Sequence, residues 1–281
     1  MNKKLIPAIL GGLGILGISS QALAYELFTV DPSAISGSRS PFKADSLIGT
    51  SSGLINLDPS TKKATESGYV TFSGFQLAGN NVAAGTSGLG VDYGLYLTFD
   101  LTASYIVGSG SGFGTNNSDY KVDILNFTMY ADKSSNTSFQ QALITGGVGS
   151  SAFVIDDATN DDDIEIATGS LKFGQSGIVS GGVTLNSTTD FILNADGESI
   201  FTEPKPFHNI MFNAFNNTGD AVAFNFNTTS GCIGSESNPC QVAVKSGGGV
   251  FDFRKVPEPA TVALLGIGLL GFGTSRLRKK A

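Results

Sequence analysis

The chain has 281 residues, with 17 Lys and Arg against 24 Asp and Glu, and its net charge is -7. Such an acidic chain repels nucleic acid and anionic lipid, so we exclude proteins that bind either through a basic surface. With 20 Phe and 41% hydrophobic residues, it has more apolar content than disordered segments carry, and we expect a folded core.

The N-terminus has the three parts of a secretory signal peptide. Two lysines are followed by an uncharged apolar run over residues 5–18 and by the small residues Ala22 and Ala24. A basic start, an apolar stretch and an A-x-A site direct export, and cleavage is expected just before Tyr25. The apolar run is shorter than the roughly 20 residues of a spanning helix, which argues against a permanent anchor. We therefore assign residues 1–24 to a signal peptide.

Period-two alternation of apolar and polar residues predicts strands through the middle of the chain. Residues 94–105 alternate over their whole length, as in a strand with one wet face. Residues 122–129 alternate with one phase slip, which predicts a β-bulge. Earlier, Val70 and Phe72 begin a strand that Gly74 interrupts.

The remaining pattern predicts an all-β body, a β-sandwich or jelly roll, over residues 25–256. Around ten short strands with Gly-rich turns support this fold class. Residues 191–194 and 199–202 bracket an Ala-Asp-Gly-Glu sequence and predict a hairpin. Residues 138–143 are the one candidate for a helix, and a short one. A parallel β-helix is the alternative architecture.

The densest polar cluster, residues 156–165, contains carboxylates at the spacing of a calcium loop. Asp157, Asp161 and Asp163, together with Thr159, stand two residues apart, and calcium takes six to eight oxygen ligands. The EF-hand pattern fails, because the Gly at its sixth position and the Glu at its twelfth are missing. The alternative is a solvated acidic turn. Apart from this calcium candidate we predict no cofactor.

Other catalytic patterns are weak. His208 is the only histidine, which excludes multi-His metal and catalytic centres, and no G-x-S-x-G elbow accompanies it. We therefore expect a structural or exposed His208, no catalytic residues and no enzymatic activity. The chain has no Trp to bind a sugar ring. Tyr96, on the polar phase of its strand, is the best exposed aromatic candidate for that role.

Cys232 and Cys240 are the only cysteines. In the oxidising compartment that the signal peptide implies, an even pair at short spacing predicts a disulfide. On the chain-entropy account this small loop stabilises the fold by roughly 2.5 kcal/mol.

The C-terminus also has three parts in a fixed order. Pro257-Glu258-Pro259 comes first, followed by uncharged, Gly-rich apolar residues 260–273 and a basic cluster. The cluster consists of Arg276, Arg278, Lys279 and Lys280. Prolines break regular structure, and a short apolar helix with a basic end inserts with that end in the cytoplasm. We therefore predict a tail over residues 257–281 that enters the inner membrane transiently as a short transmembrane helix.

This tripartite tail resembles the PEP-CTERM sorting signal of Gram-negative bacteria. The resemblance implies that an exosortase-type enzyme cuts near Pro257-Glu258-Pro259 and that the host makes exopolysaccharide. More loosely, residues 42–49, 95–99 and 250–254 give the body a layout similar to the flocculation-associated PEP-CTERM proteins. That resemblance implies a non-enzymatic protein of the cell surface or biofilm matrix, which holds cells together with exopolysaccharide.

Removing both ends leaves 11 basic and 23 acidic residues in the body, which keeps an exported protein soluble and attracts cations. The alternative function is a secreted carbohydrate-binding or hydrolytic β-domain with the same tail. A carboxylate pair in a cleft would favour a hydrolase. A row of exposed tyrosines would favour a lectin.

Overall fold

The body folds around one antiparallel sheet that closes on itself. The computed structural model describes residues 26–254 apart from 38, 146–148, 152, 157–161, 180–181, 219–220, 225, 228–230 and 233–239. Eight long strands follow one another around the ring, because β13 pairs with β12 as well as with β16 and β20 pairs with β3. In ring order they are β3 (Ser46–Asp58), β4 (Lys63–Leu77), β6 (Gly94–Tyr105), β7 (Ser118–Asp132), β12 (Asp163–Val179), β13 (Gly182–Asp190), β16 (Ile210–Thr218) and β20 (Cys240–Arg254).

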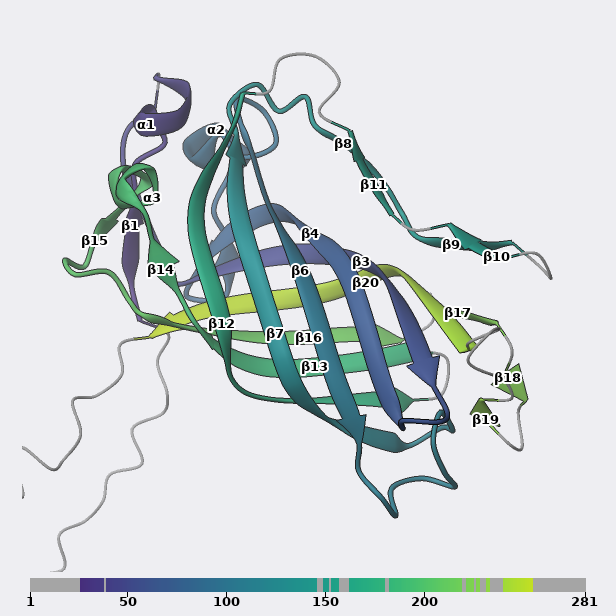
Figure 1. Cartoon of the computed structure of the whole chain (residues 1–281). Coiled ribbons are helices and arrows are strands. Elements are labelled where there is room, and N and C mark those ends of the chain that lie inside the picture. Colours follow the sequence, from purple (N-terminus) through teal and green to yellow (C-terminus); the bar gives the residue numbers. More distant parts are fainter. Residues whose placement is uncertain are drawn as a thin grey trace, which may run out of the picture.

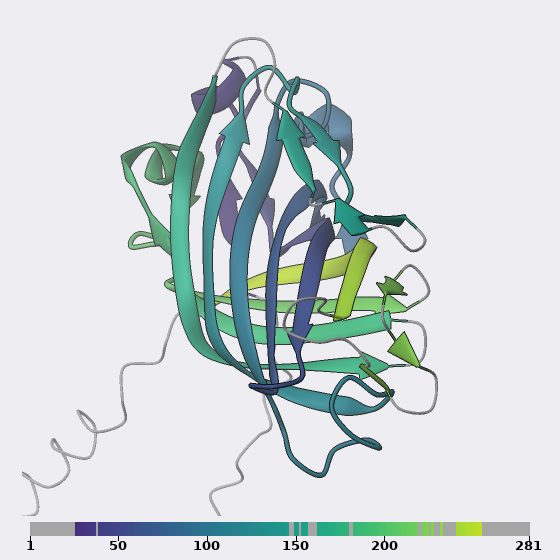
Figure 2. The ribbon, with the colours of Figure 1, turned by 45° about the vertical axis from the view of Figure 1, so that its right-hand side comes forward.

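The ring is flattened into two layers that pack face to face. Figure 1 shows β4, β6, β7 and β12 in front, while β13, β16 and β20 cross behind them at a steep angle, and Figure 2 shows the same arrangement after a turn of 45° about the vertical axis. The predicted all-β body is confirmed, and its two layers are halves of one continuous sheet. Short strands attach to this sheet or lie beside it: β5 (Asn80–Asn81), β14 (Ile192–Leu193), β17 (Ala221–Phe224), β18 (Phe226–Asn227) and β19 (Gly231–Cys232).

The strands predicted from alternation are confirmed, and so is the predicted bulge. β6 spans residues 94–105, and the phase slip in β7 is a bulge, because Thr102 pairs with Ile124 and the next residue with Val122. Gly74 does not end β4. The chain instead bulges beside it, so that Ile48 pairs with Gly74 and Gly49 with Phe72.

A small cap covers one end of the closed sheet. It consists of β1 (Phe28–Val30), β2 (Phe42–Ala44) and β15 (Phe201–Glu203), together with α1 (Ser33–Ser36) and α3 (Ala195–Ile200). Phe28 of the cap packs against residues of the core. Its ring centroid lies 5.2 Å from that of Phe253 on β20 and 6.1 Å from that of Phe201. Because these aromatic rings are buried, the cap and the sheet share one hydrophobic core.

The first and last described residues of the body lie near each other at one end of the closed sheet. The buried ring of His208 places its Nδ1 2.9 Å from Oε2 of Glu26 and its Nε2 3.3 Å from the carbonyl oxygen of Leu27. Two residues later, Ile210 pairs with Arg254, the last described residue. The segment around His208 therefore connects the first and last residues of the body.

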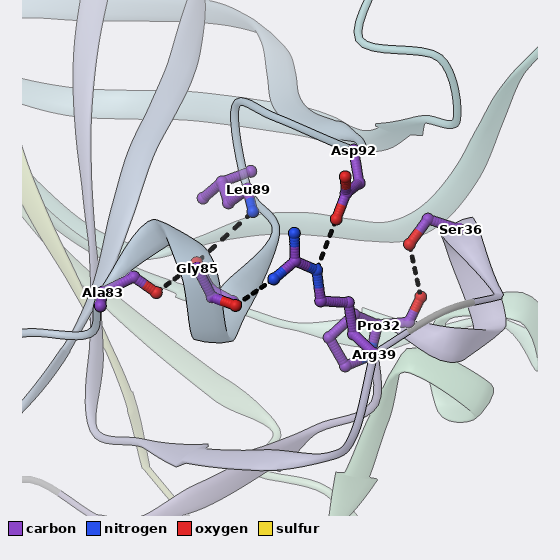
Figure 3. A network of polar contacts seen from close by, with 8 residues as sticks. Pro32, Ser36, Arg39, Ala83, Gly85, Leu89 and Asp92 are labelled. Carbon is purple, nitrogen blue, oxygen red and sulfur yellow. Dashed lines mark hydrogen bonds and ion pairs between the residues drawn. The ribbon is translucent and has the colours of Figure 1, made fainter.

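An arginine ties the chain after α1 to a second short helix, α2 (Ala84–Ser87). Nε of Arg39 lies 2.5 Å from Oδ2 of Asp92, and its Nη1 donates a hydrogen bond to the carbonyl oxygen of Gly85 (Figure 3). The ion pair is only partly buried, so we expect it to fix the loop more than to stabilise the whole fold.

An arm of short strands lies across the outside of the sheet. It contains β8 (Ser138–Gln140), β9 (Leu143–Thr145), β10 (Gly149–Ser151) and β11 (Val154–Asp156), paired as β8 with β11 and β9 with β10. The helix predicted over 138–143 is therefore wrong. Pairing of β8 with β11 and of β9 with β10 satisfies the backbone groups of this segment instead.

The hairpin predicted around Ala-Asp-Gly-Glu is also wrong, because residues 195–200 form α3. Oδ1 of Asn194 accepts a hydrogen bond from the backbone N–H of Gly197 at 2.9 Å and caps the helix. The flanking strands go to different partners: β14 pairs with β12 and β15 with β1.

Within the described residues, no helix has the length and apolar character needed to cross a membrane.

Gly169 on β12 lies too close to residues of the neighbouring strands β7 and β13 to accept a side chain. A Cβ there would lie 2.2 Å from the carbonyl oxygen of Asp190 and 2.2 Å from the ring of Phe127. We expect Gly169→Ala to lower the free energy of unfolding by about 2 to 3 kcal/mol, because the backbone must move. Urea unfolding, monitored by circular dichroism, measures this loss in the free energy of unfolding. Gly248→Ala on β20 is the control, since a Cβ there meets nothing within 4 Å; equal losses in both variants would contradict the explanation.

Candidate functional site

The closed sheet encloses a largely apolar cavity. Its volume is about 40 Å³, which is room for roughly three water molecules. Seven of the eight ring strands contribute to its wall. The lining residues are Ser51, Glu66, Val70, Leu97, Phe99, Leu125, Phe127, Val183, Thr184, Leu185, Met211, Asn213, Val244 and Phe251. An apolar cavity with a few polar groups is the usual form of a small-molecule site.

Glu66 is the charged residue in this wall. Its side chain is partly buried on β4, and burial raises the pKa of its carboxyl to about 7. Gly53 on the neighbouring strand leaves space for it, since a Cβ at that position would lie 2.7 Å from Oε1 of Glu66. The sequence motifs did not reveal Glu66 as a candidate site residue. Its parity within the strand was the available signal, because Glu66 alternates in phase with the buried Ala64 and Val70.

The other polar groups of the wall are mostly engaged with the sheet. Oγ of Ser51 donates a hydrogen bond to the carbonyl oxygen of Gly247 at 3.2 Å. Oδ1 of Asn213 accepts one from Oγ of Ser187 at 2.8 Å. These bonds hold polar side chains in place at an otherwise apolar surface, and they leave the Glu66 carboxyl as the main acceptor that faces the cavity.

Asp252 on β20 is a second carboxyl with a raised pKa, and it lies outside the cavity wall. Burial raises its pKa to about 6, the Arg254 guanidinium opposes this effect, and the Asp45 carboxylate adds to it. Its Oδ1 is buried without a hydrogen-bond partner. The fold therefore favours the protonated form of two carboxyls, those of Glu66 and Asp252.

The predicted calcium loop falls only partly within the described residues. Asp157 and Asp161 lie outside them. Asp163 lies at the start of β12, where its carboxylate joins those of Asp132 and Asp162, with ligand oxygens within 4.8 Å of one another. Clustered carboxylate oxygens suit a hard cation, and they also occur in acidic turns. Calcium binding stays a prediction, now with Asp132 and Asp162 as partners of Asp163.

Tyr96 is not the exposed platform that its strand phase suggested. Its side chain is 6% exposed, its ring stacks on Tyr130 with centroids 5.0 Å apart, and Phe139 of the arm lies 5.2 Å away. Its hydroxyl donates a hydrogen bond to Oδ2 of Asp163 at 2.6 Å. The arm covers this part of the outer face, which the alternation of a single strand cannot reveal.

A second, more open crevice lies on the cap and is lined by residues of β1, β2 and β15 and the residues next to them. Lys43, Glu203 and Lys205 provide its charged groups, and Pro204 forms part of its wall. Among the described residues, this crevice and the internal cavity each contain a single carboxylate, and neither contains His208.

The two cysteines lie on neighbouring segments of the chain. Cys232 is the last residue of β19, and Cys240 is the first residue of β20 and is buried. Residues 233–239 and the side chain of Cys232 lie outside the described part of the chain, so the disulfide stays a prediction.

The predicted sorting residues also lie outside the described part, both the signal-peptide positions Ala22 and Ala24 and the tail from Pro257 onward. Residues 255–279 match the family model of the PEP-CTERM protein-sorting motif. Neither a curated protein nor a solved structure matches this chain.

Proposed function

We propose that this chain, a PEP-CTERM sorting-domain protein by its motif at residues 255–279, promotes cell aggregation together with exopolysaccharide. The motif supports export, sorting through an exosortase-type enzyme and a location at the surface or outside the cell. After processing, the body would remain in the polysaccharide layer, without catalysis, and hold neighbouring cells together. The sorting motif at 255–279 is the observation that carries this proposal.

The body supports an adhesive role more than a hydrolytic one. A glycosidase places two carboxylates across a cleft, whereas among the described residues the internal cavity and the crevice at the cap each contain one, Glu66 and Glu203 respectively. The described fold does not present a row of exposed tyrosines, since the tyrosines within it are buried or half-buried: Tyr69, Tyr93, Tyr96, Tyr105, Tyr120 and Tyr130. The contacts with polysaccharide would therefore come from the acidic, Ser- and Thr-rich exterior.

Settling of liquid cultures tests this proposal. We compare the wild-type host with a strain that lacks the gene and a strain whose product lacks only residues 257–281. We expect both to settle several-fold more slowly while they still secrete polysaccharide, because the body is absent in one and unsorted in the other.

Two controls sharpen the comparison. Restoring the full-length gene should restore settling, and polysaccharide is quantified in every strain to exclude loss of the polymer itself. Unchanged settling in both mutant strains would overturn the aggregation role and favour a secreted binding or hydrolytic domain.

A further inference from the structure

Among the residues that the structure describes, the Glu66 carboxyl has no counter-charge in the cavity wall. Burial is the cause of its raised pKa, with no contribution from a neighbouring charge or hydrogen bond. The residues that surround it in the cavity wall are otherwise uncharged. Leaving an ionised carboxylate in such a place is unfavourable unless a cation or a donor reaches it.

Glu66 occupies a position in the sheet where an apolar residue would fit. The cross-strand partner of Glu66 is Ile55, and its neighbours in phase on β4 are Ala64 and Gly68, so the surroundings are those of an ordinary core. Gly53 lets the carboxylate fit between the strands, because a Cβ at that position would lie 2.7 Å from Oε1 of Glu66. A local violation of core chemistry beside a cavity is typical of a binding site.

The cavity wall defines the chemistry of a fitting ligand. Val70, Leu97 and Leu125 offer apolar surface, and Glu66 offers a carboxylate. A molecule with an aliphatic body and one cationic end satisfies both, because its methylenes leave water while its ammonium group meets the carboxylate. The acidic body also raises the concentration of cations near the protein.

We propose that the internal cavity binds a small aliphatic amine, with its ammonium group on the Glu66 carboxylate and its carbon atoms against Val70, Leu97 and Leu125. A volume of about 40 Å³ limits the bound part to a few non-hydrogen atoms. This site is independent of the aggregation role, so either proposal can fail without the other.

Calorimetric titration of the processed protein with n-propylamine, n-propanol and propionate tests the proposal. We expect propylamine to bind at pH 8 at least tenfold more tightly than propanol, and propionate to show no binding. At pH 5.5 we expect the affinity for propylamine to fall at least tenfold. Glu66 is then mostly protonated, while an alkylamine, which titrates at about 10 like Lys, stays charged.

Two variants identify the carboxylate. Glu66→Gln should reduce propylamine affinity at pH 8 at least tenfold, with an unchanged circular dichroism spectrum showing that it is folded. Glu165→Gln, which removes an exposed carboxylate from β12, should bind like the wild type. Equal affinity in Glu66→Gln and wild type indicates binding at the acidic surface and overturns the proposal. Propanol binding as tightly as propylamine also overturns it.

Discussion

Replacing Glu66 with Gln is expected to stabilise the body at pH 8 and to change its stability little at pH 4.5. The carboxyl has a pKa of about 7 in the folded chain against 4.5 as its ordinary value. Its favourable, neutral form is fully present below pH 4.5, and that contribution is lost as the pH rises to about 7. The difference corresponds to about 3 kcal/mol, which Gln does not lose because it cannot ionise.

Urea unfolding of both proteins between pH 4.5 and 8 measures this effect. The wild type also contains Asp252, whose raised pKa gives a pH dependence of the same sign. The difference between Glu66→Gln and wild type therefore isolates Glu66, whereas the slope of the wild type alone does not. Glu165→Gln serves as the control and should follow the wild type. A gap that stays constant from pH 4.5 to 8 would show that the effect is one of packing and not of ionisation.

Phe28→Ala is expected to lower the free energy of unfolding by about 3 to 5 kcal/mol, the usual range for a buried Phe. Phe28 is 1% exposed, and its ring contacts the rings of Phe75, Phe207 and Phe253 as well as that of Phe201. Removing it leaves a void where the cap meets the sheet, so its packing energy is lost on both sides.

Phe173→Ala is the matched control, because it makes the same chemical change at a side chain that is 64% exposed on β12. We expect its free energy of unfolding to change by less than about 0.5 kcal/mol. Guanidinium unfolding of the two variants, monitored by circular dichroism, gives both numbers. Similar losses in the two variants would mean that Phe28 does not hold the cap to the core.

The sequence predicted those parts of the fold that depend on short-range patterns. Alternation located β6, and the phase slip located the bulge in β7. Closure of the sheet through β12 and β13 depends on how long strands twist toward each other, and no local pattern encodes that. α3 was missed because its cap residue, Asn194, was read as the end of a strand.

The candidate site was harder to foresee than the fold. Glu66 lies between Thr65 and Ser67 in a polar stretch, which resembles an exposed strand when it is read alone. Its position in the cavity follows from the partners of β4 on both sides, and these come from elsewhere in the chain. Asp163 was identified as an acidic candidate, but its partner Asp132 lies on β7, beyond the reach of a loop motif.

The position of β20 connects the order of export with the order of folding. β20 is the last strand of the body, ending at Arg254, and it fills the gap between β16 and β3. A chain that crosses the membrane from its N-terminus first can assemble most of the sheet early, but the sheet stays open until this final segment has passed through. The sorting motif begins at residue 255. Completion of the described fold and arrival of the sorting motif are therefore consecutive events, and a molecule that reaches the exosortase has already exported every strand that the structure describes.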